Sequence, residues 1–304
     1  MVCSCLDCSV LTNNRFIKFL GKGPSIWDDM THNFPEKIAD KSNGDVAADS
    51  YNLYKEDVQM LKNSSMQFYR FSIAWSRVMS DGDYSSINEA GLLYYDRLIG
   101  ELLENGIEPV VTMYHWDLPS KLQNLGGFLN PKIVDYFVAY ADVLFKRYAT
   151  RVKIWTTFNE PQIICENGYA TAERAPLVNL PGIGGYLCAH HIILAHARVY
   201  DLYQKNYKEA LGKIGLVISC GFKMPKDPNN PAHIDAANRV LQFNCGHYTH
   251  PIFSKTGGYP QVMVDMIGEK SKKEGRAWSR LPEFDEATKN FVKGLIQFLN
   301  LALK

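Results

Sequence analysis

Short apolar runs and longer amphipathic segments alternate along the sequence. The short runs are rich in Val, Ile, Thr and aromatic residues and have few polar interruptions, as expected of strands buried on both faces. They are FYRFSI at 68–73, PVVTMY at 109–114, KIWTTF at 153–158 and KIGLVIS at 213–219. These runs predict four strands of a buried parallel sheet.

The segments between the runs have the periodicity of helices. In the stretch 87–106, apolar residues repeat at helical spacing, and Gly106 is placed to end the helix. Further helices are predicted at 131–148, where Pro131 suits the first turn, and at 184–205. Repeated strand–helix units imply a parallel sheet with helices outside it.

A doubly wound sheet and a (β/α)8 barrel share this pattern. A doubly wound nucleotide binder usually shows a Gly-rich turn after its first strand, and neither G-x-G-x-x-G nor G-x-x-x-x-G-K-[ST] occurs here. Instead, polar and aromatic residues lie at the predicted strand ends: Arg70, then His115 and Trp116, then Asn159 and Glu160. Catalytic groups from several strand ends are typical of barrels, so the sequence favours an α/β fold of the (β/α)8 TIM-barrel type.

Composition excludes several classes of partner. The 304 residues are 46% hydrophobic and 21% charged, which suits one large globular domain or two smaller ones, and no linker divides them. The net charge of +1 gives no reason to expect a nucleic acid or other polyanionic partner. The sequence contains no long uninterrupted apolar run, so no membrane span is predicted. The start, MVCSCLDCSV, lacks a basic segment followed by an apolar core, so it does not resemble a secretory leader, and the location stays open.

The cysteines do not predict a disulfide framework, because seven is an odd number and their spacing is irregular. Cys3, Cys5 and Cys8 crowd the start of the chain. A closed zinc site would need a fourth ligand, and none is nearby. We therefore interpret these three cysteines as part of a disordered, unpaired tail.

Three histidines have a spacing that suggests a metal site: His190, His191 and His196. They fall in a predicted helix with a plain apolar face. No carboxylate or cysteine nearby completes a ligand set, so we interpret them as packing or surface residues. No metal and no cofactor is expected.

Several long motifs together resemble glycoside hydrolase family 1, the family of β-glucosidases, lactase-type enzymes and myrosinases. The motifs are GKGPSIWD, GDVAADSYNLYKEDV, YRFSIAWSR, TMYHWDLP, GGFLNP, TFNEP and SRLPEF, in the family's order. The stretches DLPSKLQNLGGFLNP and WSRLPEF are most similar in sequence to animal members of the family, insects among them. Some other barrel glycosidase families also place NEP after the fourth strand, but RFSIAWSR and YHWDLP together argue against them.

The resemblance implies a retaining mechanism acting on β-glycosides. A general acid protonates the leaving oxygen, and a nucleophilic carboxylate about 5–5.5 Å away forms a glycosyl-enzyme. By resemblance, Glu160 is the acid/base, Asn159 binds the sugar 2-hydroxyl, His115 and Trp116 contact the sugar, and Arg70 keeps the nucleophile ionised. Without the motifs, His115 and Trp116 would be packing residues and Arg70 part of a structural ion pair.

The second carboxylate is the open question. The family nucleophile lies in a TENG-like motif at the end of strand seven. Glu166, in the letters ENG, follows Glu160 by six residues on the same connection and cannot easily face it across a sugar. The stretch FVKGLIQFLNLALK resembles the sixth strand, and the sugar-binding Gln of the first strand has no match in CSVLTNNRFIKFL.

We therefore expect residues 1–20 to be a divergent segment and residues 21–304 to be a partial barrel with about strands two to six. The expected function is that of a retaining β-glycosidase for O-glycosyl or S-glycosyl bonds of β-glucoside-type substrates. We expect this chain to be inactive alone because the nucleophile is missing. The alternative is a non-catalytic sugar-binding remnant or a truncated product without function. The sugar specificity and the oligomeric state stay open.

Overall fold

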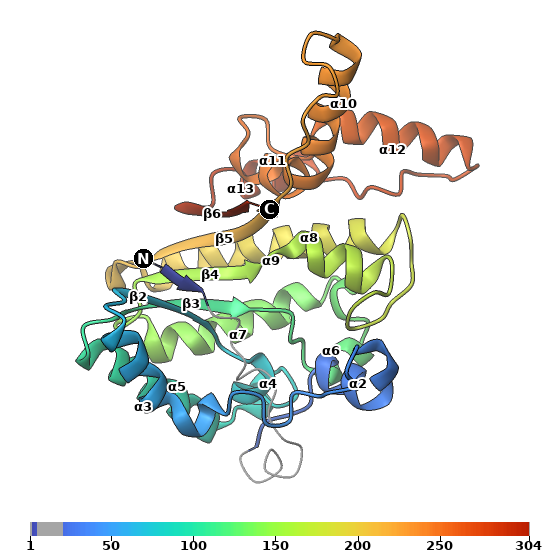
Figure 1. Ribbon diagram of the computed structural model, residues 1–304. Coiled ribbons are helices and arrows are strands. Elements are labelled where there is room, and N and C mark those ends of the chain that lie inside the picture. The colour runs from blue at the N-terminus through green and yellow to red at the C-terminus, as the bar shows by residue number, and fades with distance from the viewer. Residues whose placement is uncertain (1, 5–20, 304) are drawn as a thin grey trace.

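The computed structural model describes residues 2–4 and 21–303, and it shows a parallel sheet with helices packed around it (Figure 1). In this part of the chain the sheet has six strands in the order β1 to β6, and each strand pairs with its neighbour in parallel. The bounds are β1 Val2–Ser4, β2 Phe68–Ser72, β3 Glu108–Tyr114, β4 Ile154–Asn159, β5 Lys213–Cys220 and β6 Phe298–Leu303. The four strands predicted from apolar runs and the sixth strand predicted by resemblance are therefore confirmed.

Strand β1 differs from the expected disordered tail. Val2–Ser4 pairs with β2, with Val2 opposite Phe68. The open edge of β2 carries backbone N–H and C=O groups, and a short extended segment gives them partners. The other residues of the predicted divergent segment, including Cys5, Cys8 and the run at 15–20, lie outside the described residues.

Helices cover the outer face of the sheet. The three predicted helices are confirmed as α5 Glu89–Glu104, α7 Ile133–Tyr148 and α9 Gly184–Asn206. The other α-helices are α2 Ile26–Asn33, α3 Ser50–Asn63, α4 Trp75–Val78, α6 Ser120–Asn124, α8 Pro161–Ile163, α10 Pro231–Leu241, α11 His247–Phe253, α12 Gln261–Lys273 and α13 Glu286–Val292. Two π-helical turns are η5 Ile164–Gly168 and η7 Gln242–Gly246. In Figure 1, α10 and α12 project away from the layer formed by α5 and α7.

Aromatic side chains fill the layer between the helices and the sheet. Phe137 of α7 stacks on Phe158 of β4 with ring centroids 4.3 Å apart, and Trp75 stacks on Tyr140 at 4.7 Å. The Tyr140 hydroxyl also donates to the carbonyl oxygens of Ile73 and Met113, so this buried hydroxyl has hydrogen-bond partners. This packing fixes the strands, and so it fixes the positions of the residues that follow their carboxyl ends.

Two disulfides correct the expectation that the cysteines form no framework. Cys165 of η5 is bonded to Cys188 of α9, and Cys220 at the end of β5 is bonded to Cys245 of η7. The partners are 23 and 25 residues apart in sequence. The fold brings them together, which an odd count with irregular spacing could not reveal. Both bonds fasten the connections that follow β4 and β5.

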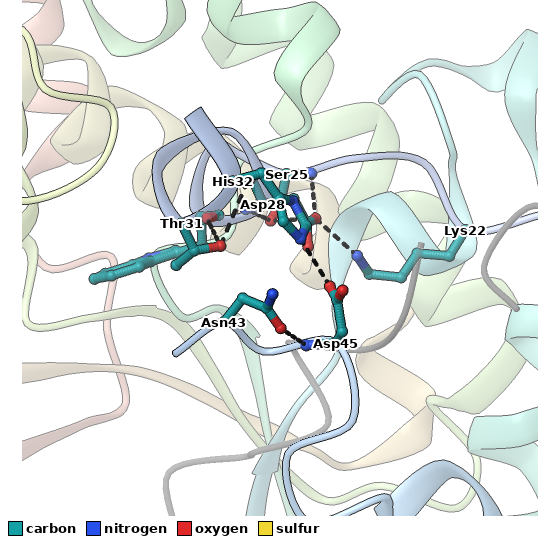
Figure 2. A network of polar contacts seen from close by, with 8 residues as sticks. Lys22, Ser25, Asp28, Thr31, His32, Asn43 and Asp45 are labelled. Carbon is teal, nitrogen blue, oxygen red and sulfur yellow. Dashed lines mark hydrogen bonds and ion pairs between the residues drawn. The ribbon is translucent and has the colours of Figure 1, made fainter. Parts of the chain in front are cut away.

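A buried polar network anchors the segment before α2 (Figure 2). Lys22 Nζ lies 2.9 Å from Asp28 Oδ2, and both side chains are almost fully buried. Ser25 donates from its backbone N–H and its hydroxyl to the same Asp28 oxygen, and it forms the N-cap of α2. Next to Ser25, the Ile26 N–H donates to the Leu118 carbonyl at 2.9 Å. The segment that this network holds is thus joined to the loop after β3.

The histidines of α9 pack, as the sequence interpretation proposed. His191 Nδ1 lies 2.7 Å from the Phe128 carbonyl oxygen, and His190 stacks on Phe284. His196 is fully buried between the Thr157 hydroxyl and the Leu295 carbonyl. Across residues 2–4 and 21–303, no group of three or more His, Cys, Asp or Glu is placed to hold a metal ion. Within the same ranges, no helix has both the length and the apolar character needed to cross a bilayer.

Candidate active site

The five predicted site residues come from three neighbouring strands. Arg70 lies on β2, His115 and Trp116 directly follow β3, and Asn159 ends β4 with Glu160 next to it. The register of the β3–β4 pair places Tyr114 opposite Phe158. Because parallel strands end at the same edge of the sheet, the residues after Tyr114 and Phe158 emerge side by side. The structure thus brings the five residues together, with His115, Trp116, Asn159 and Glu160 at the carboxyl ends of β3 and β4 and Arg70 reaching them from the middle of β2.

Asn159 is the centre of a hydrogen-bond network. Arg70 Nη1 donates to Asn159 Oδ1 at 3.1 Å, and Asn159 Nδ2 lies 2.9 Å from His115 Nε2. The amide oxygen is thus turned toward the guanidinium, so the amide N–H must donate to His115 Nε2. This arrangement assigns the proton of a neutral His115 to Nδ1. The Trp116 indole N–H donates to the Asn159 backbone carbonyl at 2.8 Å.

The electrostatics of His115 agree with that assignment. Burial and, to a smaller extent, the nearby Arg70 cation lower the pKa of His115 to about 4. The imidazole is therefore neutral near pH 7. A neutral ring in this position can exchange hydrogen bonds with a sugar hydroxyl without adding charge.

Arg70 and Glu160 interact electrostatically. Burial lowers the pKa of Arg70, and the charge of Glu160 opposes that shift. An arginine stays protonated despite such a shift, because its ordinary pKa is far above neutrality. The site therefore holds a half-buried cation within reach of the carboxylate that was predicted to be the acid/base.

The backbone is strained at two of the site residues. Trp116 has φ 77° and Glu160 has φ 45°, and both values lie in the left-handed region that favours glycine. The strained turn at Glu160 is held on both sides: its N–H donates to the Val217 carbonyl of β5 at 2.8 Å, and its carbonyl accepts from the Ile163 N–H at 2.9 Å. Non-glycine residues in this region are concentrated at functional sites, where the surrounding structure holds them in place.

Asp117 belongs to the site region, and sequence analysis did not single it out. It is fully buried, and burial raises its pKa to about 7. Asp117 Oδ1 accepts a hydrogen bond from the His115 backbone N–H at 3.3 Å. Its position inside the motif YHWDLP was the available signal. The side chain braces the turn that presents His115 and Trp116.

A cavity of about 880 Å³ adjoins the segment that follows Glu160. Its polar lining includes Gln162, Glu166, Arg239, His247, Lys270 and Arg280. Burial, with a smaller effect of His190, lowers the pKa of His247 to about 3, so this ring is neutral as well. Glu166, which sequence analysis set aside as a nucleophile, faces this cavity. Gln162 was also missed, although it stands only two residues after Glu160.

A partial (β/α)8 barrel with polar side chains at its strand ends has the architecture of a barrel enzyme, and comparison with known proteins specifies the family. The model of glycosyl hydrolase family 1 matches residues 17–303. The chain is similar to Myrosinase 1 of Brevicoryne brassicae, with 46% identity over 282 residues, which are 92% of this chain and 60% of that protein. This chain belongs to glycosyl hydrolase family 1.

Solved structures agree with that assignment. An aphid myrosinase superimposes with a TM-score of 0.92 at 43% identity, covering 97% of this chain and 64% of the aphid chain. A rice β-glucosidase mutant, solved in a covalent complex with glucose, has a TM-score of 0.89 at 36% identity, covering 97% of this chain and 61% of the rice chain. The chain therefore spans about three fifths of the length of these relatives.

Proposed function

We propose that these residues form the acid/base half of a retaining β-glycosidase site for β-glucoside-type substrates with an O-linked or S-linked leaving group. The observation that carries the proposal is the Arg70–Asn159–His115 network beside Glu160. The names of the relatives, a myrosinase and a β-glucosidase, supply the substrate class.

Each residue has a role that its contacts support. Glu160 protonates the leaving oxygen as the bond to the anomeric carbon breaks, and it later takes a proton from water. Asn159 is oriented by Arg70 and His115, so that its amide is ready to bind a sugar 2-hydroxyl. His115 and Trp116 form the polar and the flat apolar parts of the sugar subsite. The adjoining cavity lies beyond Glu160 and is large enough to receive a leaving group.

We further propose that a polypeptide of these 304 residues does not turn over β-glucosides by itself. In the family the nucleophile comes from a seventh strand, whereas the described sheet contains β1 to β6. Among the described residues, Glu160 is the carboxylate whose negative charge raises the pKa of Arg70. Glu166 shares its βα connection with Glu160, which places it poorly to attack the opposite face of the same sugar. A general acid alone contributes about 10²–10⁴-fold, which is too little for glycoside cleavage.

The experiment measures dinitrophenolate release from a dinitrophenyl β-glucoside by the purified, monodisperse chain. We expect no turnover above that of the Glu160→Gln variant. Azide is then added as an external nucleophile: its nitrogen bonds to the anomeric carbon while the carbon–oxygen bond breaks and dinitrophenolate leaves with the electron pair. The expected product is an α-glucosyl azide. Because this leaving group needs no proton, Glu160→Gln should form the azide as well as the unsubstituted chain does.

Two outcomes would contradict the proposals in different ways. Robust turnover without azide that Glu160→Gln abolishes would show that another carboxylate, such as Glu166, serves as the nucleophile. Absence of glucosyl azide, together with absence of binding of a β-glucoside in calorimetry, would mean that the sugar subsite itself is not functional.

A non-catalytic sugar-binding role is the second candidate. It is favoured by the neutral polar groups of Asn159 and His115, which contact each other independently of any nucleophile. Binding of a β-glucoside that Asn159→Leu weakens, with no product formed at any azide concentration, would support this candidate.

A further inference from the structure

The sequence contains one tripeptide of the form N-x-[ST] with a residue other than proline in the middle. It is Asn63-Ser64-Ser65. This tripeptide is the acceptor signal for N-linked glycosylation. Short motifs of this kind occur by chance, so the surroundings of Asn63 decide whether the folded chain could carry a glycan there.

The fold leaves the tripeptide open to a large substituent. Asn63 is the last residue of α3, and Ser64 and Ser65 form the turn after it. All three residues are exposed. The turn is held by its backbone, since the Ser65 N–H donates to the Lys62 carbonyl at 2.9 Å. In the described parts of the chain, neither the Asn63 amide nor the Ser65 hydroxyl takes part in a hydrogen bond.

The position of Asn63 keeps a substituent away from the site. The turn Ser64–Ser65 leads into the amino end of β2, whereas the site residues follow the carboxyl ends of β3 and β4. A glycan on Asn63 would therefore project from the opposite end of the strands. Met60 lies one helical turn before Asn63 and is 62% exposed. A glycan at this place would shield an apolar side chain from solvent.

The two disulfides are an independent observation about the compartment in which the chain folds. Structural disulfides form and persist in oxidising compartments and are rare in the cytosol. Cys165–Cys188 and Cys220–Cys245 both join elements of the folded core. The oxidising lumen of the endoplasmic reticulum is also where N-glycans are transferred to emerging chains.

We propose that Asn63 is the acceptor of an N-linked oligosaccharide. The co-reactant is a lipid-diphosphate-linked oligosaccharide. A bond forms between Asn63 Nδ2 and the anomeric carbon of the first N-acetylglucosamine, the bond from that carbon to the diphosphate oxygen breaks, and the lipid diphosphate leaves with the electron pair. The amide gives up one proton to a base of the transferase. The helical conformation of Asn63 does not hinder the transfer, because it takes place before the chain has folded.

The test expresses the full chain behind a secretion leader in cultured insect cells, with a separate reporter acceptor tripeptide in a C-terminal tag. The reporter shows whether each molecule has met the transferase. We expect two glycans on the chain, and enzymatic deglycosylation should convert Asn63 to aspartate in the peptide mass spectrum. Asn63→Gln and Ser65→Ala should each remove one glycan. Ser64→Ala is the matched control, since it changes the neighbouring serine but keeps the acceptor tripeptide, and it should keep both glycans.

Two results would overturn the proposal. One is a chain glycosylated in the tag with unmodified Asn63. The other is a chain whose Asn63→Gln and Ser65→Ala variants keep both glycans. Neither result depends on the sugar-cleaving site, so the outcome is separate from the test of the proposed function.

Discussion

Arg70 and Asn159 lie 89 residues apart in sequence, and the guanidinium of Arg70 donates to the amide oxygen of Asn159 at 3.1 Å. This bond determines which way the amide points. It leaves the amide nitrogen to donate to His115, so one hydrogen bond between β2 and β4 also sets the tautomer of a histidine that follows β3.

The substitution Asn159→Asp tests this relationship. A carboxylate can accept from Arg70 but has no proton to donate to His115 Nε2, so His115 must become the donor. We expect the pKa of His115 to rise from about 4 by about 1–3 units, since a nearby negative charge favours the imidazolium. NMR titration of the histidine ring protons measures it. Asn159→Leu removes the amide without adding charge and should leave the pKa low; an unchanged pKa in Asn159→Asp would contradict the assigned network.

The buried ion pair of Figure 2 should matter far more than an exposed one. Lys22→Met removes the cation from a nearly fully buried pair and leaves Asp28 charged, which should cost about 3–5 kcal/mol of unfolding free energy. Lys121→Met breaks the exposed pair with Asp81 and should leave the urea midpoint unchanged. Equal effects of the two variants would show that the burial of Lys22 has no energetic consequence.

Two glycines of α5 provide a matched pair for packing. A Cβ on Gly91 would lie 2.0 Å from the Arg77 carbonyl oxygen, whereas a Cβ on Gly100 would meet no atom within 4 Å. Gly91→Ala should therefore destabilise the fold by about 1–3 kcal/mol. Gly100→Ala should stabilise it by about 0.5–1 kcal/mol, because alanine restricts the unfolded chain and favours a helix. Thermal unfolding measures the stability of both variants. A Gly91→Ala variant as stable as the unsubstituted chain would contradict the close contact of α5 with α4.

Burial of His196 predicts a loss of stability in acid. Burial lowers the pKa of His196 from 6.5 to about 4. Between these pH values the unfolded chain binds a proton that the folded chain does not, so stability falls as the pH falls from 6.5 to 4. Asp117 has the opposite sign, because its raised pKa lets the folded chain bind the extra proton below pH 7. A comparison of variants is therefore needed to isolate His196.

From pH 7 to pH 5, urea unfolding of the unsubstituted chain should lose about 2 kcal/mol more than unfolding of His196→Gln. The glutamine variant is expected to be less stable at pH 7 but to depend less on pH. Parallel pH profiles for the two proteins would mean that His196 has the same pKa in the folded and the unfolded chain.

The sequence predicted the parts of the fold that depend on local pattern. Strands β2 to β5 are largely apolar runs, and His115, Trp116, Asn159 and Glu160 follow two of those runs directly, so both could be located. The disulfide between Cys220 and Cys245 depends on where η7 returns to β5, and no spacing encodes that. Asp117 was missed because its importance comes from complete burial, which only the tertiary structure reveals. The cavity beside Gln162 could not be predicted for the same reason, since its walls come from segments far apart in the chain.

The left-handed backbone at Trp116 and Glu160 has an evolutionary consequence. An L-residue in that conformation costs about 1–2 kcal/mol relative to glycine, so folding alone would favour glycine at both positions. The tryptophan and glutamate side chains are thus present although the backbone conformation favours glycine. If the site were no longer used in a related protein, replacement of Trp116 and Glu160 by glycine would increase stability and should occur early. The residues found at these two positions in related chains therefore indicate whether selection still acts on the site.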